Sequence, residues 1–132
     1  MKIFCLFFII IHFYVSATES DKPLQTRCAR IKLKADCVDE TRNWFNTMML
    51  RKSEVLEILK EQGVYVESVF LDQINEDYYL IYFMKEENTQ KSLAISSQST
   101  HPINEAHKQY KKKCWEGKKI LEPLLDLDRI PH

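Results

Sequence analysis

The sequence contains little glycine or proline and no excess of charge of either sign. Only two of its 132 residues are glycine and four are proline, which argues against a glycine-rich phosphate loop or a proline-rich linker. Nineteen basic side chains balance nineteen acidic ones, so bulk electrostatic binding of nucleic acid is not expected. Apolar residues make up 45% of the chain and charged residues 29%, which is typical of one globular domain.

The N-terminus has the pattern of a secretory signal. Lys2 precedes an unbroken apolar run over 3–11, small or light residues follow at 15–17, and a polar segment comes next. The run is well below the roughly 20 residues that span a bilayer. We therefore predict a signal peptide over 1–17 and export to the periplasm or the medium, with no membrane attachment after cleavage; an uncleaved anchor is the alternative.

Hydrophobic periodicity predicts the first half of the domain. Strict alternation of apolar and basic residues over 29–34 predicts a strand. Helical spacing follows over 38–62, where Ser53 is a candidate N-cap for a second helix placed end to end with the first. Gly63 then supplies the C-terminal stop.

The second half repeats the pattern with a hairpin first. Strands are predicted over 64–71 and 78–84, around a polar turn at 72–77. A helical region begins at Asn88 or Thr89, breaks at the serine-rich patch 96–100 and restarts at Pro102. Gly117 ends this helix, and a last strand is predicted at 119–122. The order β-α-β-β-α-β predicts an α+β, ferredoxin-like sandwich over 28–122, with a polar leader at 18–27 and a C-terminal tail at 123–132.

This topology predicts a homodimer. The strands 29–34 and 78–84 occupy the centre of the sheet, and the second of them is apolar at nearly every position. The helices of one chain cover only one face, so we expect a second copy to pack on the other face around a two-fold axis. The alternative is that the leader and the C-terminal tail cover that face.

The topology also predicts a disulfide. Cys28, Cys37 and Cys114 remain after removal of the signal, and the end of the first strand lies beside the start of the last. Cys37–Cys114 is therefore the preferred pair and Cys28 is left over. Three reduced, buried thiols are the alternative.

A set of segments spread over several predicted elements carries a family resemblance: 30–34, 54–57, 63–71, 79–84, 101–103, His107 and 114–115. Together they resemble an uncharacterised bacterial family that itself resembles the dimeric α+β barrel superfamily. The resemblance covers about Cys28 to Trp115 and implies a dimeric barrel, but no activity, because the family has none established. The wider superfamily includes small monooxygenases, haem-degrading enzymes and muconolactone-isomerase-like proteins.

The candidate ligand-binding residues lie partly on the predicted sheet. Arg30 and Lys32 share one face of a central strand, where charges are costly unless paired or solvated. Across the dimer Glu67 neutralises one of them, and the rest of the positive charge favours a small anionic ligand beside Tyr82 or Tyr79. The alternative is an interfacial salt-bridge network that sets the register of the dimer.

Two histidines in the body of the domain are further candidates for ligand binding. His107 and Cys114 share a helical face but are about 10 Å apart along the helix, so a catalytic dyad is not expected. No pair among His101, His107 and Cys114 has the spacing of metal ligands, and no metal is predicted. The alternatives are a hydrogen-bonded core position for His107 and a cap or loop position for His101.

Three functions remain open from the sequence. A pocket lined by Trp44, Phe45, Met48 and Met49 is the feature that relatives in the superfamily use for substrates, although a plain core is the alternative. We favour an exported, non-catalytic protein that binds a small ligand or a partner and needs no cofactor. A cofactor-independent monooxygenase-like or haem-handling enzyme and a secreted effector or interaction protein are the alternatives.

Overall fold

The computed structural model describes residues 22–130, which form an α+β structure. Each predicted helical region is divided into two helices. Within the described residues the elements are β1 (Gln25–Leu33), α1 (Val38–Leu50), α2 (Lys52–Glu61), β2 (Val64–Ile74), β3 (Asp77–Glu86), α3 (Thr89–Gln98), α4 (Pro102–Cys114) and β4 (Trp115–Ile120). The predicted signal peptide lies outside the described residues.

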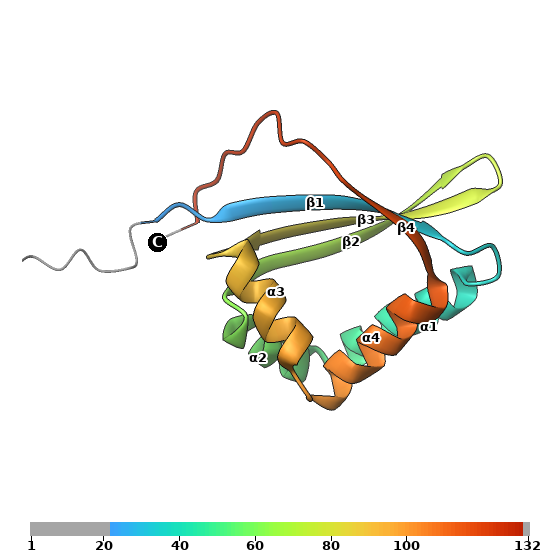
Figure 1. Ribbon diagram of the computed structural model, residues 1–132, viewed down its shortest axis with the longest axis horizontal. Coiled ribbons are helices and arrows are strands. Elements are labelled where there is room, and N and C mark those ends of the chain that lie inside the picture. Colours follow the sequence, from blue (N-terminus) through green and yellow to red (C-terminus); the bar gives the residue numbers. More distant parts are fainter. Residues whose placement is uncertain (1–21, 131–132) are drawn as a thin grey trace, which may run out of the picture.

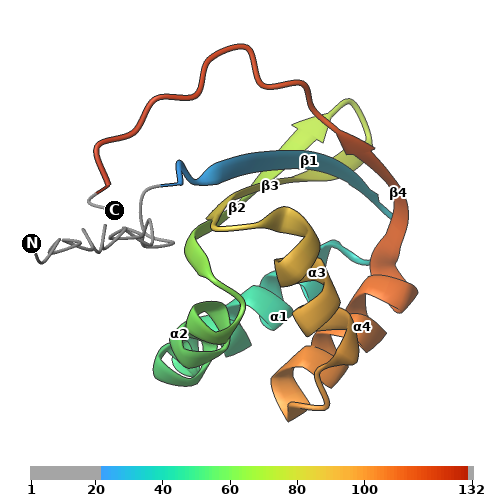
Figure 2. The same ribbon diagram turned by 60° about the vertical axis from the view of Figure 1, so that its left-hand side comes forward.

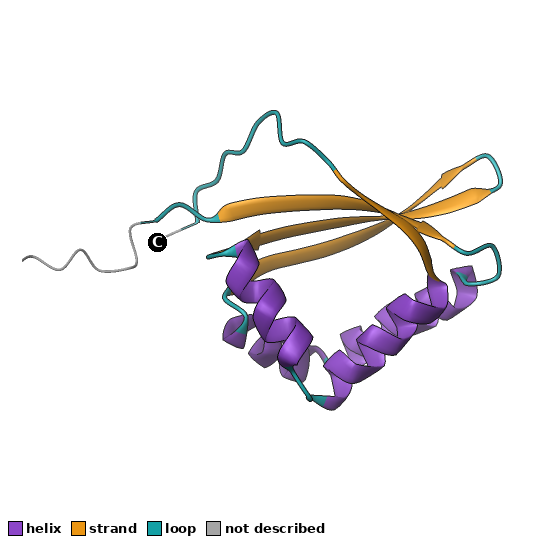
Figure 3. Ribbon diagram, in the orientation of Figure 1, coloured by secondary structure: helices purple, strands orange, loops and turns teal. Residues whose placement is uncertain are grey.

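The four strands form one antiparallel sheet with the order β2-β3-β1-β4. All four helices cover the same face of this sheet, and no helix within residues 22–130 covers the other face (Figures 1, 2 and 3). Ala29, Ile31 and Leu33 of β1 point toward the helices and form the main core with Leu80 and Met84 of β3. Residues of opposite parity, such as Ile81 and Phe83, belong to the uncovered face.

The first helical region breaks at Arg51, two residues before the predicted cap. The Arg51 backbone leaves the helical range at φ −105° and ψ 29°, and its guanidinium bonds the Glu54 carboxylate at 2.6 Å and 2.8 Å. The prediction of Ser53 as the N-cap is therefore wrong, since α2 begins at Lys52 without a side-chain cap. Gly63 does end α2, with a positive φ of 68°.

The hairpin is longer than its sequence suggests. Its tight turn lies at Asn75 and Glu76, with Asn75 at φ 56°, so the strands extend through Ile74 and from Asp77. The predicted polar turn over 72–77 is therefore too long. An irregularity between Val64 and Val66 changes the pairing register at the start of β2.

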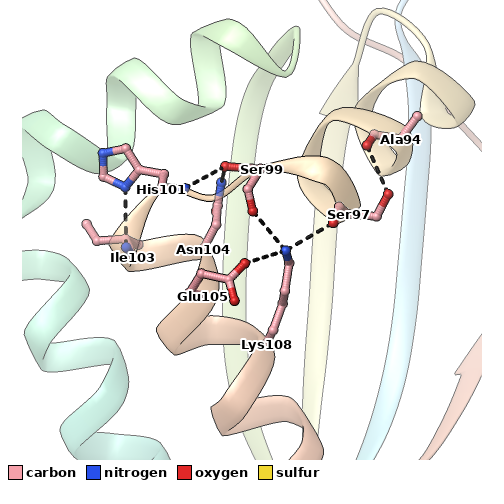
Figure 4. Close-up of polar contacts among 8 residues, drawn as sticks. All are labelled: Ala94, Ser97, Ser99, His101, Ile103, Asn104, Glu105 and Lys108. Carbon is pink, nitrogen blue, oxygen red and sulfur yellow. Dashed lines mark hydrogen bonds and ion pairs between the residues drawn. The ribbon is translucent and has the colours of Figure 1, made fainter.

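Asn88 caps the start of α3 by accepting a hydrogen bond from the Lys91 amide, and Pro102 is the first residue of α4, as predicted. Polar contacts at the junction between the end of α3 and the start of α4 hold these helices at an angle. Lys108 reaches back from α4 and donates to the carbonyls of Ser97 and Ser99 at 3.0 Å and 2.8 Å (Figure 4). A cation at these carbonyls complements the C-terminal end of the α3 dipole.

Two boundaries near the chain ends differ from prediction. β1 begins at Gln25, inside the predicted leader, and β4 occupies Trp115–Ile120 in place of 119–122, with Gly117 in the strand. After β4 the chain returns past β1 toward the end of the sheet where β1 starts (Figures 1 and 2). There Asp126 and Asp128 of the tail pair with Lys85, whose side chain is 8% exposed.

The predicted disulfide is present. Cys37 precedes α1 and Cys114 ends α4, and their Cα atoms are 5.5 Å apart. The bridge lies in a second core cluster with Tyr110, whose hydroxyl is 2.9 Å from the hydroxyl of Thr41. None of the helices in the described part of the chain is long and apolar enough to cross a membrane.

Candidate functional site

A pocket of about 130 Å³ lies between the sheet and the helices. One part of its wall is apolar and comes mainly from β1, β3 and α2, with single residues from α1, α3 and α4. The other part is charged and polar, and comes from β1, β2, β3, α3, α4 and β4. The residues that define its chemistry are Arg27, Glu67, Tyr82, His107, Lys111 and Lys118.

Glu67 and Tyr82 form the acidic part of the pocket. The Tyr82 hydroxyl donates a 2.6 Å hydrogen bond to Glu67 Oε1 from the neighbouring strand. Burial raises the pKa of the Glu67 carboxyl, although the bond from Tyr82 and the charge of Arg27 oppose the shift. Burial and the nearby Glu67 carboxylate place the pKa of Tyr82 well above its usual range, so its hydroxyl keeps its proton.

His107 is a neutral hydrogen-bond donor in this pocket. Trp44 Nε1 donates to His107 Nδ1 at 3.0 Å, so the proton of the neutral ring resides on Nε2. The Trp44 and His107 rings are stacked, with centroids 5.7 Å apart. Burial and the charge of Lys111 lower the pKa of His107 to about 4, and the ring is uncharged at neutral pH.

Three cations line the same pocket. Arg27 is bound by Glu86, with Nε 3.0 Å from Oε1, and Glu86 is fully buried. Lys111 lies over the Trp115 ring, 5.6 Å from its centroid. Within the described part of the chain, neither Lys111 nor Lys118 is in an ion pair.

The cations repel one another. Burial lowers the pKa of Lys111, and the charges of Lys118, Lys108 and Arg27 lower it further. Burial and then Arg27 lower the pKa of Lys118 in the same way. Among the described residues, Glu67 is the only acid in the pocket wall. The charged part of the pocket therefore carries excess positive charge that an anion would neutralise.

Three of the six predicted ligand residues meet in this pocket, and Arg30, Lys32 and His101 do not. Glu67, Tyr82 and His107 are brought together from β2, β3 and α4. Arg30 and Lys32 lie on the opposite face of the sheet, because their positions in β1 alternate with those of Ala29 and Ile31. Glu67 lies on the helix-covered side, so it does not meet Arg30 or Lys32 within one protomer, and its neutralisation of one of them across a dimer stays a prediction.

Arg30 and Lys32 have partners on the uncovered face. The Arg30 guanidinium lies over the Tyr79 ring, 5.2 Å from its centroid. Lys32 Nζ is 3.3 Å from Asp77 and 3.4 Å from Glu116, which are both half exposed. These ion pairs lie within one protomer, so a salt-bridge network at an interface between two copies stays a prediction.

His101 is not part of the pocket wall. Its Nδ1 accepts a 3.3 Å hydrogen bond from the Ile103 amide at the start of α4, and its Nε2 lies 3.4 Å from Glu54 (Figure 4 shows the first contact). It acts as the cap that the alternative interpretation described. The four residues of the predicted apolar pocket separate in the structure. Met48 lines the pocket described here, Trp44 and Phe45 pack in the core, and Met49 is exposed.

Sequence reasoning missed the three cations. The predicted leader over 18–27 includes Arg27, and neither Lys111 nor Lys118 is among the ligand-binding residues predicted from the sequence. Arg27 has the same parity as Ala29 and Ile31. Extending the first predicted strand back to residue 27 would therefore have placed the Arg27 side chain on the helix-covered face of the sheet. Lys111 follows His107 at i+4, which is one turn along the same helix face.

One group of side chains near the disulfide has the ligand atoms and the spacing of a possible metal site. Cys37, Cys114 and Glu40 bring their sulfur and carboxylate atoms within 4.8 Å of one another, the only such group within residues 22–130. Both sulfurs are bonded to each other, so neither is a thiolate ligand in this state.

A sequence model for a family of unknown function, DUF6176, matches residues 24–132. This range includes every strand and helix described above. No curated protein matches the chain.

Proposed function

The chain belongs to the DUF6176 family, whose function is unknown, and we propose from the pocket that it binds a small organic anion between the sheet and the helices. The observation that carries this proposal is the charge of the pocket wall, where Arg27, Lys111 and Lys118 face a single acid. Glu86 neutralises Arg27, so the two lysines supply the unbalanced charge.

The rest of the wall favours an organic ligand over a bare inorganic ion. Ala29, Ile31 and Met84 from the sheet and Ile58 and Leu59 from α2 form an apolar surface beside the charges. A pocket of about 130 Å³ is close to the roughly 150 Å³ cavity that holds benzene in another protein. A carboxylate on a small apolar group fits both parts of the wall.

Benzoate and benzamide test this proposal as a charged and a neutral probe of one shape. We expect benzoate to raise the midpoint of thermal unfolding and benzamide to have little effect, because only the first neutralises the lysines. The variants Lys111→Gln and Lys118→Gln should each weaken benzoate binding about tenfold. Lys112→Gln is the matched control, since Lys112 is exposed on the same helix. Equal stabilisation by both probes would contradict the proposal.

We also propose that the fold is of the ferredoxin-like, dimeric α+β barrel type and that two copies pack through the uncovered sheet face. The strand order and the placement of all helices on one face support this. Ile81 and Phe83 on β3 and the exposed Phe70 on β2 supply apolar surface there. The tail contact with Lys85 engages only one end of β3.

Light scattering on the wild type and on Phe83→Lys tests the dimer. We expect twice the chain mass for the wild type and the monomer mass for the variant, whose charge opposes burial of this face. A wild-type monomer at micromolar concentration would contradict the proposal.

Export is the third proposal, and the Cys37–Cys114 disulfide supports it because such bonds persist in oxidising compartments. Intact mass of the protein recovered from the culture medium or periplasm should show loss of residues 1–17. Full-length protein confined to the cytoplasm would exclude this proposal.

A further inference from the structure

The pocket brings a carboxylate and a neutral imidazole close to one tyrosine. Tyr82 donates to Glu67 at 2.6 Å, and its ring centroid is 6.4 Å from that of His107. All three residues line the pocket. We propose that Glu67 removes a proton from the carbon next to the carbonyl group of a small 2-oxo acid, while His107 donates a hydrogen bond to the oxygen of the resulting enolate. The inference rests on the proposed function, because the carboxylate of the 2-oxo acid is the anion that the lysines bind.

Glu67 has the surroundings of a general base. It is the only carboxylate in the pocket wall, and Tyr82 is the only residue in the described chain that donates a hydrogen bond to it. The charged groups that act on it are Arg27 from β1, Glu86 from β3 and Lys111 from α4. Burial outweighs the cations and raises the Glu67 pKa, which makes its carboxylate a stronger base.

His107 has the surroundings of an electrophile. The Trp44 bond to Nδ1 leaves Nε2–H as the donor on the remaining side of the ring. Lys111 and burial keep the ring neutral. A carboxylate base with a neutral imidazole donor is a known combination for proton transfer next to a carbonyl, because the neutral ring matches the weak acidity of an enol.

The reaction balances without an oxidant, a reductant or a cofactor. The C–H bond at the carbon next to the carbonyl breaks, and its proton moves to Glu67. The electron pair forms a carbon–carbon double bond as the carbonyl π electrons move to oxygen. Glu67 then exchanges its proton with solvent and returns one to the same carbon, so that in D₂O the net change is replacement of hydrogen by deuterium.

We would test this with 2-oxobutanoate in D₂O, and follow the C3 methylene signal by proton NMR. The wild type should accelerate its loss over buffer alone. Glu67→Gln should lower the protein-dependent rate at least about 100-fold, and His107→Gln should lower it about 10- to 100-fold by weakening the donor. Glu61→Gln, an exposed acid at the end of α2, is the matched control and should keep the wild-type rate.

Binding is measured in the same samples by saturation-transfer NMR, and thermal unfolding confirms that each variant is folded. Binding of 2-oxobutanoate without faster exchange would overturn proton transfer and leave anion binding standing. Absence of binding would overturn both. An unchanged rate in a folded Glu67→Gln protein would exclude Glu67 as the base. The wild-type rate should also rise with pH as Glu67 loses its proton.

Discussion

Individual side chains in the pocket have pKa values that are shifted from those of the same residues in water. Glu67 is held toward its neutral form by burial, and His107 is kept neutral by burial and by Lys111. The hydrogen bonds made by these two groups each join different elements: Tyr82 to Glu67 across two strands, and Trp44 to His107 across two helices. Burial of titratable side chains with shifted pKa values lowers the stability of the folded protein and is common at functional sites.

Glu67→Gln should therefore stabilise the protein at neutral pH. The raised pKa means that the folded state prefers the protonated carboxyl, so this group favours folding below its unfolded pKa near 4.5 and loses that contribution as pH rises through its folded pKa. The amide has no such titration, and its oxygen accepts the Tyr82 bond. Urea unfolding should show the variant more stable than wild type at pH 7.5 and similar at pH 3.5. A variant less stable than wild type at pH 7.5 would contradict this.

Breaks within the helical regions shape the pocket at the level of the elements. α1 and α2 change direction at Arg51, and α3 and α4 change direction between Ser99 and His101. The two bent pairs are visible below the sheet in Figures 1 and 2. Straight helices would lie flat on the sheet and fill the space with their own side chains. The turn at Gly63 then directs the chain from α2 into β2, which carries Glu67.

Gly63→Ala should destabilise the protein by about 1–2 kcal/mol. Gly63 has a φ of 68°, and an added Cβ would lie 2.9 Å from Glu87 Oε2. Gly117→Ala is the control, because a Cβ there meets no atom within 4 Å. Urea unfolding of both variants measures the difference. Equal stability of the two proteins would show that the turn tolerates a side chain.

At the scale of the whole molecule, the disulfide joins the two helices that supply the Trp44–His107 contact. Cys37 lies before α1 and Cys114 at the end of α4, and the Thr41–Tyr110 hydrogen bond lies next to them. The bridge has a sequence separation of 77 residues and so closes most of the domain. It therefore constrains the unfolded chain strongly and also holds one side of the pocket in place.

Cys37→Ser with Cys114→Ser should lower the free energy of unfolding by about 4 kcal/mol, because the unfolded chain gains the entropy of an open loop. Cys28→Ser is the control, since Cys28 is the free cysteine of the described chain and is only partly buried. Urea unfolding of both proteins without reductant gives the difference. A loss below about 1 kcal/mol in the double variant would show that the bridge adds little.

The sequence by itself determined the element order, the helix breaks, the stop at Gly63 and the preferred Cys37–Cys114 pair. These follow from hydrophobic periodicity and from residues whose backbone preferences act locally, and the pairing follows from the order of the elements. Only the tertiary structure decided which charged residues share the pocket. Arg27 and Lys118 come from strands whose ends were misplaced by several residues, and a strand residue changes face with each single step of register. The charge states of Glu67 and His107 depend on burial by distant elements, which no local pattern records.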